Sequence, residues 1–146
     1  MKLLLISQTV TCFFMTGVIW IIQTIHYPGF IFADRAGFQK FHEFHSSRIT
    51  PIVGPVMFIE LLTAVGLFLV SWEITSRAET LWSSINLALV LGLWALTVFV
   101  SVPIHNSLAT GFDAQLVEKL TTTNWYRTAL WTLRSVFLSI LIYRRL

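Results

Sequence analysis

The amino-acid sequence predicts an all-α integral membrane protein folded as a four-helix bundle. Of its 146 residues, 55% are hydrophobic and 12% are charged, whereas a soluble domain carries roughly 25% charged residues. A helix needs about 20 mostly apolar residues to cross the core of a bilayer. The chain has room for a single domain with four such stretches. We expect these spans at residues 3–26, 51–72, 81–104 and 125–143.

The first stretch follows Met1 and Lys2, a beginning that secretory signal peptides share. No small-x-small cleavage site follows it, and no charged residue occurs between Lys2 and Asp34, so we expect a retained first helix. In the loop at residues 27–49 we expect a short interfacial amphipathic helix, because four residues recur at i, i+3, i+4 and i+7. These residues are Phe38, Phe41, His42 and His45.

The second and fourth spans carry boundary signals. Thr50 followed by Pro51 is typical of an N-cap with proline at the first helical position. Asn124 is a candidate cap for the fourth helix. That helix contains Arg127 and Arg134 and is the least hydrophobic of the four. We retain it because leaving it out would strand its apolar segments in water.

Four crossings place both termini on one side of the membrane. That side carries Lys2, Arg77, Arg144 and Arg145, and the other side carries Arg35, Lys40, Arg48, Lys119 and Arg127. Four basic residues on one side and five on the other do not determine the orientation of the protein in the membrane. If Arg48 and Arg127 are engaged in protein contacts, the terminal side has the excess and the termini are cytoplasmic. The lone Cys12 has no partner for an intrachain disulfide.

The basic residues are scattered without a Lys/Arg block, which argues against a nucleic-acid partner. The partners that we expect are the lipid bilayer and a small hydrophobic molecule. The sequence is also compatible with assembly into a homo-oligomer.

The same topology gathers the histidines. His26 ends the first span and His105 ends the third, while His42 and His45 lie in the loop helix. All four therefore belong to one membrane face. Imidazole is a common ligand of Fe, Cu and Zn, so the pattern indicates a metal or haem site, to which Glu43 and Glu60 could add oxygen ligands. The plainer interpretation is that these are interfacial residues at helix ends, since no metal motif of fixed spacing occurs.

Two charged residues are expected in the middle of the bilayer. Glu60 lies nine residues after Pro51, and Arg134 lies ten after Asn124, which places both about 13–15 Å from the same face. Pairing the two offsets the cost of burying each charge. Arg127 lies two turns from Arg134 on the same helix face, with Trp131 between them for a cation–π contact. Such a pair can serve catalysis or simply fix the register of the helices.

Two short patterns in the C-terminal half point to a family. They are Val102-Pro103-Ile104-His105-Asn106 and Asn124-Trp125-Tyr126-Arg127-Thr128. Both resemble the turn after the third helix and the start of the fourth in the small four-helix membrane family that includes the fungal anthrone oxygenases. The resemblance covers residues 97–134 and the four-span layout. It implies that the pocket end of the bundle contains Asn106, Asn124, Arg127 and Arg134. His105 in the turn and the helix with His42 and His45 depart from the family pattern.

These observations favour a membrane-embedded, metal-dependent oxidoreductase or oxygenase that acts on a small hydrophobic substrate. The histidines would hold Fe, Cu, Zn or a haem, and the candidate catalytic residues are Glu60, Arg127 and Arg134. The candidate substrate-binding residues are Gln23, Arg48, Asn106 and Asn124. One alternative is a non-catalytic membrane subunit or lipid-binding scaffold. Another is a proton or solute pathway, which ranks lower because the terminal half of the bundle carries few polar residues.

Overall fold

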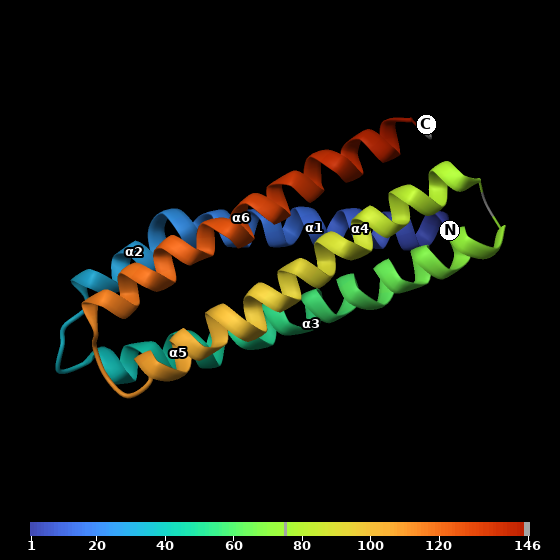
Figure 1. Ribbon diagram of the computed structural model, residues 1–146. Coiled ribbons are helices and arrows are strands. Elements are labelled where there is room, and N and C mark those ends of the chain that lie inside the picture. The colour runs from blue at the N-terminus through green and yellow to red at the C-terminus, as the bar shows by residue number, and fades with distance from the viewer. Residues whose placement is uncertain (75, 145–146) are drawn as a thin grey trace.

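Four long helical segments make up the computed structural model, which describes residues 1–74 and 76–144 (Figure 1). The first segment is α1 (Lys2–Ile21), continued by the π turn η1 (Ile22–His26), α2 (Tyr27–Gly29) and the 3-10 turn η2 (Phe30–Phe32). The second is α3 (Phe38–Ile74). The third is α4 (Arg77–Leu96), the π turn η3 (Thr97–Ser101) and α5 (Val102–Leu108). The fourth is α6 (Ala114–Tyr143), and no strand occurs in the described ranges.

The segments form a ring in which neighbours run antiparallel. α1 packs against α3 and α6, and α4 packs against the same two helices. The two chain ends lie together with the last turns of α3 and the start of α4, at what we call the terminal end (Figure 1). The connections from α2 to α3 and from α5 to α6 lie at the opposite, distal end (Figure 1). The segments that carry histidines therefore meet at the distal end.

Three of the segments are long and apolar enough to cross a bilayer, namely Lys2–Phe32, Phe38–Glu73 and Arg77–Leu108. α6 has a comparable length, but Lys119, Arg127 and Arg134 interrupt its apolar residues. The predicted all-α class is confirmed for the described residues, and length and composition support three of the four predicted spans.

The amphipathic helix predicted before the second span is not a separate element. Residues 38–49 form the first turns of α3, and both Pro51 and Pro55 lie inside that helix. Proline removes one backbone donor, but a continuous helix keeps its other backbone groups paired, which matters most where no water is present. Of the four residues on the predicted face, Phe38, His42 and His45 are buried, whereas Phe41 is exposed.

The fourth helix begins at Ala114, well before the predicted start at residue 125. The carboxylate of Asp113 caps it by accepting hydrogen bonds from the backbone N–H groups of Gln115 (2.8 Å) and Leu116 (3.1 Å). Asn124 is therefore not a cap. Its side chain is fully buried in the middle of α6, where tertiary contacts use the amide that the sequence suggested as a cap.

Replacing Asp113 with alanine is expected to lower the free energy of unfolding by about 1 kcal/mol, because two N–H groups of the first turn of α6 lose their acceptor. Thermal unfolding in detergent measures the effect. Asp113→Asn is the matched control, since its amide oxygen still accepts these bonds and should preserve stability. A loss in Asp113→Asn equal to the loss in Asp113→Ala would assign the effect to the charge instead of the cap.

Candidate functional site

The four histidines of the chain contact one another, and we call them the histidine cluster. His26 comes from η1, His42 and His45 come from α3, and His105 comes from α5. The ring centroids of His26 and His45 are 4.4 Å apart, and those of His42 and His105 are 5.3 Å apart. His45 and His105 stack at 5.5 Å and join the two pairs. The structure thus brings together all four imidazoles that the sequence assigned to one face.

The imidazoles contact one another through their ring nitrogens. Nε2 of His26 lies 2.6 Å from Nδ1 of His45, and Nε2 of His42 lies 3.0 Å from Nδ1 of His105. Nε2 of His105 lies 2.9 Å from the hydroxyl oxygen of Tyr27. In each imidazole pair one nitrogen carries the proton and the other offers a lone pair. The lone pairs in these contacts accept hydrogen bonds, so a metal ion that used them would replace those bonds.

Two π turns direct histidines toward the cluster. η1 contains His26 and precedes Pro28, while η3 precedes Pro103 and His105. A proline cannot donate a hydrogen bond to the residue four positions earlier. One added residue in a turn rotates the chain beyond it by about 100° relative to an uninterrupted α-helix. These turns therefore set which side of the helix each histidine occupies, and such π turns are frequent at functional sites.

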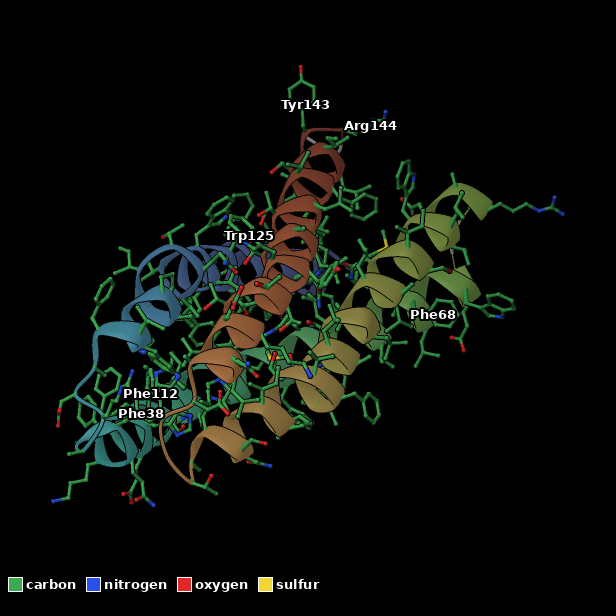
Figure 2. All side chains as sticks on the ribbon, turned by 60° about the vertical axis from the view of Figure 1, so that its left-hand side comes forward. Phe38, Phe68, Phe112, Trp125, Tyr143 and Arg144 are labelled. Atoms are coloured by element: carbon green, nitrogen blue, oxygen red, sulfur yellow. The ribbon has the colours of Figure 1, made fainter. Side chains whose placement is uncertain are left out.

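Aromatic rings surround the cluster. Phe30 is fully buried, and its ring centroid lies 5.2 Å from that of His26 and 5.4 Å from that of His45. Phe38 stacks on His42 at 6.0 Å and contacts Phe112 at 5.2 Å. Figure 2 shows Phe38 and Phe112 together, far from the two labelled residues of the C-terminal end. The imidazoles thus lie in an apolar setting that keeps water away from much of their surface.

One buried nitrogen of the cluster has no partner. His45 is 5% exposed, and its Nε2 atom is buried without a hydrogen bond. Leaving a buried polar atom unpaired costs about 1–3 kcal/mol, so such an atom marks a place where a partner is missing. Within residues 1–74 and 76–144, no three His, Cys, Asp or Glu side chains have the spacing of metal ligands as they stand. The cluster is therefore two imidazole pairs with one nitrogen that is both buried and unpaired.

An open groove of about 960 Å³ reaches the histidine cluster between the first turns of α3 and α5. Three imidazoles form part of its wall, those of His42, His45 and His105. Small or polar residues make up much of the remainder, including Glu43, Ser46, Ser47, Thr50 and Asn106. The groove gives a small molecule access to the imidazoles. Asn106, a predicted substrate-binding residue, is exposed on this wall.

The next layer of the bundle is a network of buried amides with one arginine. Nδ2 of Asn124 donates to Oε1 of Gln23 at 2.9 Å, and Nε2 of Gln23 donates to the backbone oxygen of Thr121 at 3.1 Å. Nη1 of Arg127 donates to Oδ1 of Asn124 at 3.1 Å and to Oγ of Ser101 at 3.2 Å. Gln23 and Asn124, predicted to bind substrate, are thus engaged by protein groups.

Contacts continue from Arg127 to the predicted ion pair. The guanidinium of Arg127 lies 5.3 Å from the ring centroid of Trp131, which is the contact that their spacing predicted. Nε1 of Trp131 donates to Oε2 of Glu60 at 3.2 Å. Oε1 of Glu60 accepts from Nη1 of Arg134 at 2.7 Å, and both side chains are at most 2% exposed. The Glu60–Arg134 pair is therefore present and buried.

The ion pair belongs to a central polar layer with one side chain from each segment: Gln8, Glu60, Asn86 and Arg134. Arg134 also donates from Nη2 to Oε1 of Gln8 at 2.6 Å and from Nε to Oδ1 of Asn86 at 3.2 Å. Asn86 donates from Nδ2 to Oε1 of Gln8 at 3.2 Å. Because both oxygens of Glu60 are engaged here, this layer positions the helices and leaves Glu60 no free oxygen with which to bind a metal.

The structure does not bring Arg48 into the site. Its exposed guanidinium lies 5.6 Å from the ring centroid of Phe44, on the outer side of α3. Three site residues were missed by the sequence analysis: Gln8, Tyr27 and Asn86. Tyr27 follows His26 directly, so its position next to a predicted ligand was an available signal. A single amide within an apolar span, such as Gln8, gives no comparable signal because its partner is on another helix.

Comparison with family models, with curated proteins and with solved structures gave no match. The class of protein therefore follows from the fold and the site of the described residues alone. It is an all-helical protein with three helices able to cross a membrane and a histidine cluster at one end of the bundle. The resemblance to the anthrone oxygenase family stays a prediction.

Proposed function

We propose that the chain is a four-span integral membrane protein whose histidine cluster binds a first-row transition-metal ion. We further propose that it acts as an oxidoreductase on a small hydrophobic molecule that enters through the groove. The observation that carries the proposal is the buried, unpartnered Nε2 of His45 amid three other imidazoles. Imidazole nitrogen suits Fe, Cu and Zn, and the first two of these metals support electron transfer and oxygen chemistry.

The surface of α6 supports a fourth span. α6 packs along both α1 and α4, which belong to apolar segments. Its 30 residues are about 45 Å long, enough to cross a whole bilayer. From residue 125 to residue 143 its arginines at 127 and 134 are buried, whereas its exposed large side chains are apolar or aromatic: Trp125, Tyr126, Leu133, Val136, Ile140 and Tyr143. The exposed charged residues Glu118 and Lys119 precede this stretch. This division suits a helix with lipid on one side and a polar bundle interior on the other.

The orientation predicted from the basic residues loses its support. Arg127 is buried in protein contacts, but Arg48 is exposed. Removing only Arg127 from the distal count of five leaves four basic residues on each side, which favours neither direction. The proposal is therefore a multi-pass membrane protein of either orientation.

The nitrogen separations within the cluster fit a shared metal ion after small movements. Metal–imidazole bonds are about 2.0–2.1 Å long, so two nitrogens on one tetrahedral ion are about 3.3 Å apart. The two imidazole contacts measure 2.6 and 3.0 Å. Opening these contacts to ligand spacing requires ring movements of up to about 0.7 Å. His45 would bind the ion through one nitrogen, either the Nδ1 that now contacts His26 or, after a turn of the ring, its free Nε2. His26, His42, His45 and His105 are the ligands that we propose.

A haem held between two of these imidazoles does not fit. Two axial nitrogens on opposite sides of one iron are about 4 Å apart, twice the metal–nitrogen bond length. The paired nitrogens lie 2.6 and 3.0 Å apart, and Phe30 and Phe38 pack directly against the rings. No slot for a macrocycle separates them, so an isolated metal ion is the better fit.

The metal content of the purified protein tests the proposal. The protein is expressed with an affinity tag free of histidine, purified in detergent and examined by elemental analysis and visible absorption. We expect about one Fe, Cu or Zn ion per chain, without a haem band, because four imidazoles provide a complete tetrahedral ligand set. Substoichiometric metal, both after purification and after incubation with each of the three ions, would contradict the proposal and leave a non-catalytic membrane scaffold.

A further inference from the structure

Arg127 is a buried cation without a counter-charge. The buried side chains that are charged at neutral pH in the described ranges are Glu60, Arg127 and Arg134. Glu60 pairs with Arg134, so one positive charge remains in the interior, at a side chain that is 6% exposed. An isolated charge at the centre of a membrane helix costs on the order of 2.5–3.5 kcal/mol. An anion beside Arg127 would offset that cost.

The hydrogen bonds of Arg127 leave the Nε atom of its guanidinium open. Nη1 donates to the neutral side chains of Ser101 and Asn124, and the guanidinium also hydrogen-bonds to the side chain of Tyr27. Nε is buried and has no partner. Its N–H group is a charged donor that matches an oxygen of a carboxylate.

We infer that Arg127 binds an oxyanion, such as a carboxylate, through its Nε atom. Nη1 is fixed by Ser101 and Asn124, and the ring of Trp131 lies 5.3 Å from the guanidinium carbon. These contacts hold the plane of the guanidinium and pre-organise the free Nε–H group. The low dielectric around a side chain buried to this extent strengthens a charge-assisted bond.

The anion site is coupled to the histidine cluster. Arg127 interacts electrostatically with both Tyr27 and His105, and the Tyr27 hydroxyl lies 2.9 Å from Nε2 of His105. An oxyanion at Nε would therefore be separated from the imidazoles by Arg127 and Tyr27. The inference goes beyond the proposed metal function and does not depend on it, because the unpartnered Nε and the missing counter-charge are properties of the protein alone.

Anion-dependent melting tests the inference. Wild-type protein is treated with a chelator, so that no anion can bind to a metal, and is titrated with sodium formate or with sodium chloride at equal ionic strength. We expect formate to raise the melting temperature saturably above the chloride reference, as a ligand of the native state does. Arg127→Gln should lose this difference. Arg127→Lys, which keeps the charge but has no N–H group at the position of Nε, should bind formate about tenfold more weakly or worse.

Arg35→Gln is the matched control. Its guanidinium is exposed and lies 5.3 Å from the ring centroid of Phe112, so its removal should leave the formate effect unchanged. The inference is overturned if wild-type protein shows no difference between formate and chloride, or if Arg127→Gln or Arg127→Lys retains the full difference. Wild-type and Arg127→Lys measurements decide the question even if Arg127→Gln does not fold.

A further titration separates the two sources of such an anion. Decanoate carries the same carboxylate on a membrane-soluble chain. Saturation at a much lower concentration of decanoate than of formate would assign the site to the headgroup of a lipid-like substrate. Equal saturation by the two would assign it to a small oxyanion from water.

Discussion

Replacing Glu60 with alanine is expected to lower the free energy of unfolding by about 3–5 kcal/mol, the largest effect on stability of any single substitution considered. The change removes the carboxylate that pairs with Arg134 at 2.7 Å and accepts from Trp131 at 3.2 Å. Arg134 is fully buried and would keep its charge with only neutral amide partners. Reversible unfolding of the detergent-solubilised protein by a denaturing detergent measures the loss.

Two control variants distinguish the ion pair from general sensitivity of the bundle. Glu118→Ala removes an exposed carboxylate from α6 and should change stability by less than about 0.5 kcal/mol. The double variant Glu60→Met/Arg134→Leu removes both charges together and should recover much of the loss, since a buried ion pair can often be replaced by apolar side chains. If Glu60→Ala is as stable as Glu118→Ala, the central layer does not stabilise the fold.

The depth of Glu60 and Arg134 could be predicted from the sequence because a charge in the middle of an apolar span is costly and few partners are available to it. Glu60 and Arg134 do pair, although both helix starts from which their depths were counted, Pro51 and Asn124, were wrong. Pro51 lies within α3, and α6 begins at Ala114. Both counts nevertheless placed the residues at a common depth, which is all that pairing requires.

The amides of the central layer could not be predicted in the same way. Gln8 and Asn86 are neutral, and a lone amide in a span is compatible with many packing arrangements. Their roles depend on the helices that surround Arg134, because Gln8 accepts from both Asn86 and Arg134. The partners of Gln8 and Asn86 are set by the order of the helices around the ring, which no local sequence pattern specifies.

The convergence of the histidines depended on topology more than on spacing. An even number of antiparallel segments brings the end of the first, the start of the second and the end of the third to one place, whatever the residues between them. The direction of His26 and His105 depends on two π turns. Both precede a proline, at Pro28 and Pro103.

His45→Ala is expected to weaken metal binding by about 100-fold or more, since even the loss of a group that only orients a metal ligand costs 10–100-fold. His45 occupies the middle of the cluster, with ring centroids at 4.4 Å from His26, 6.3 Å from His42 and 5.5 Å from His105. Removing it therefore separates the other imidazoles and deletes the free Nε2. Competition with a chromophoric chelator measures the affinity of each variant.

Glu43→Gln is the control that assigns the effect to the imidazoles. The Glu43 carboxylate is exposed on the wall of the same groove, so it is the nearest alternative source of an oxygen ligand. We expect Glu43→Gln to bind metal like the wild-type protein. If this variant loses the metal while His45→Ala retains it, the ion belongs to the groove surface, and the unpaired nitrogen of His45 must be explained by something other than a metal.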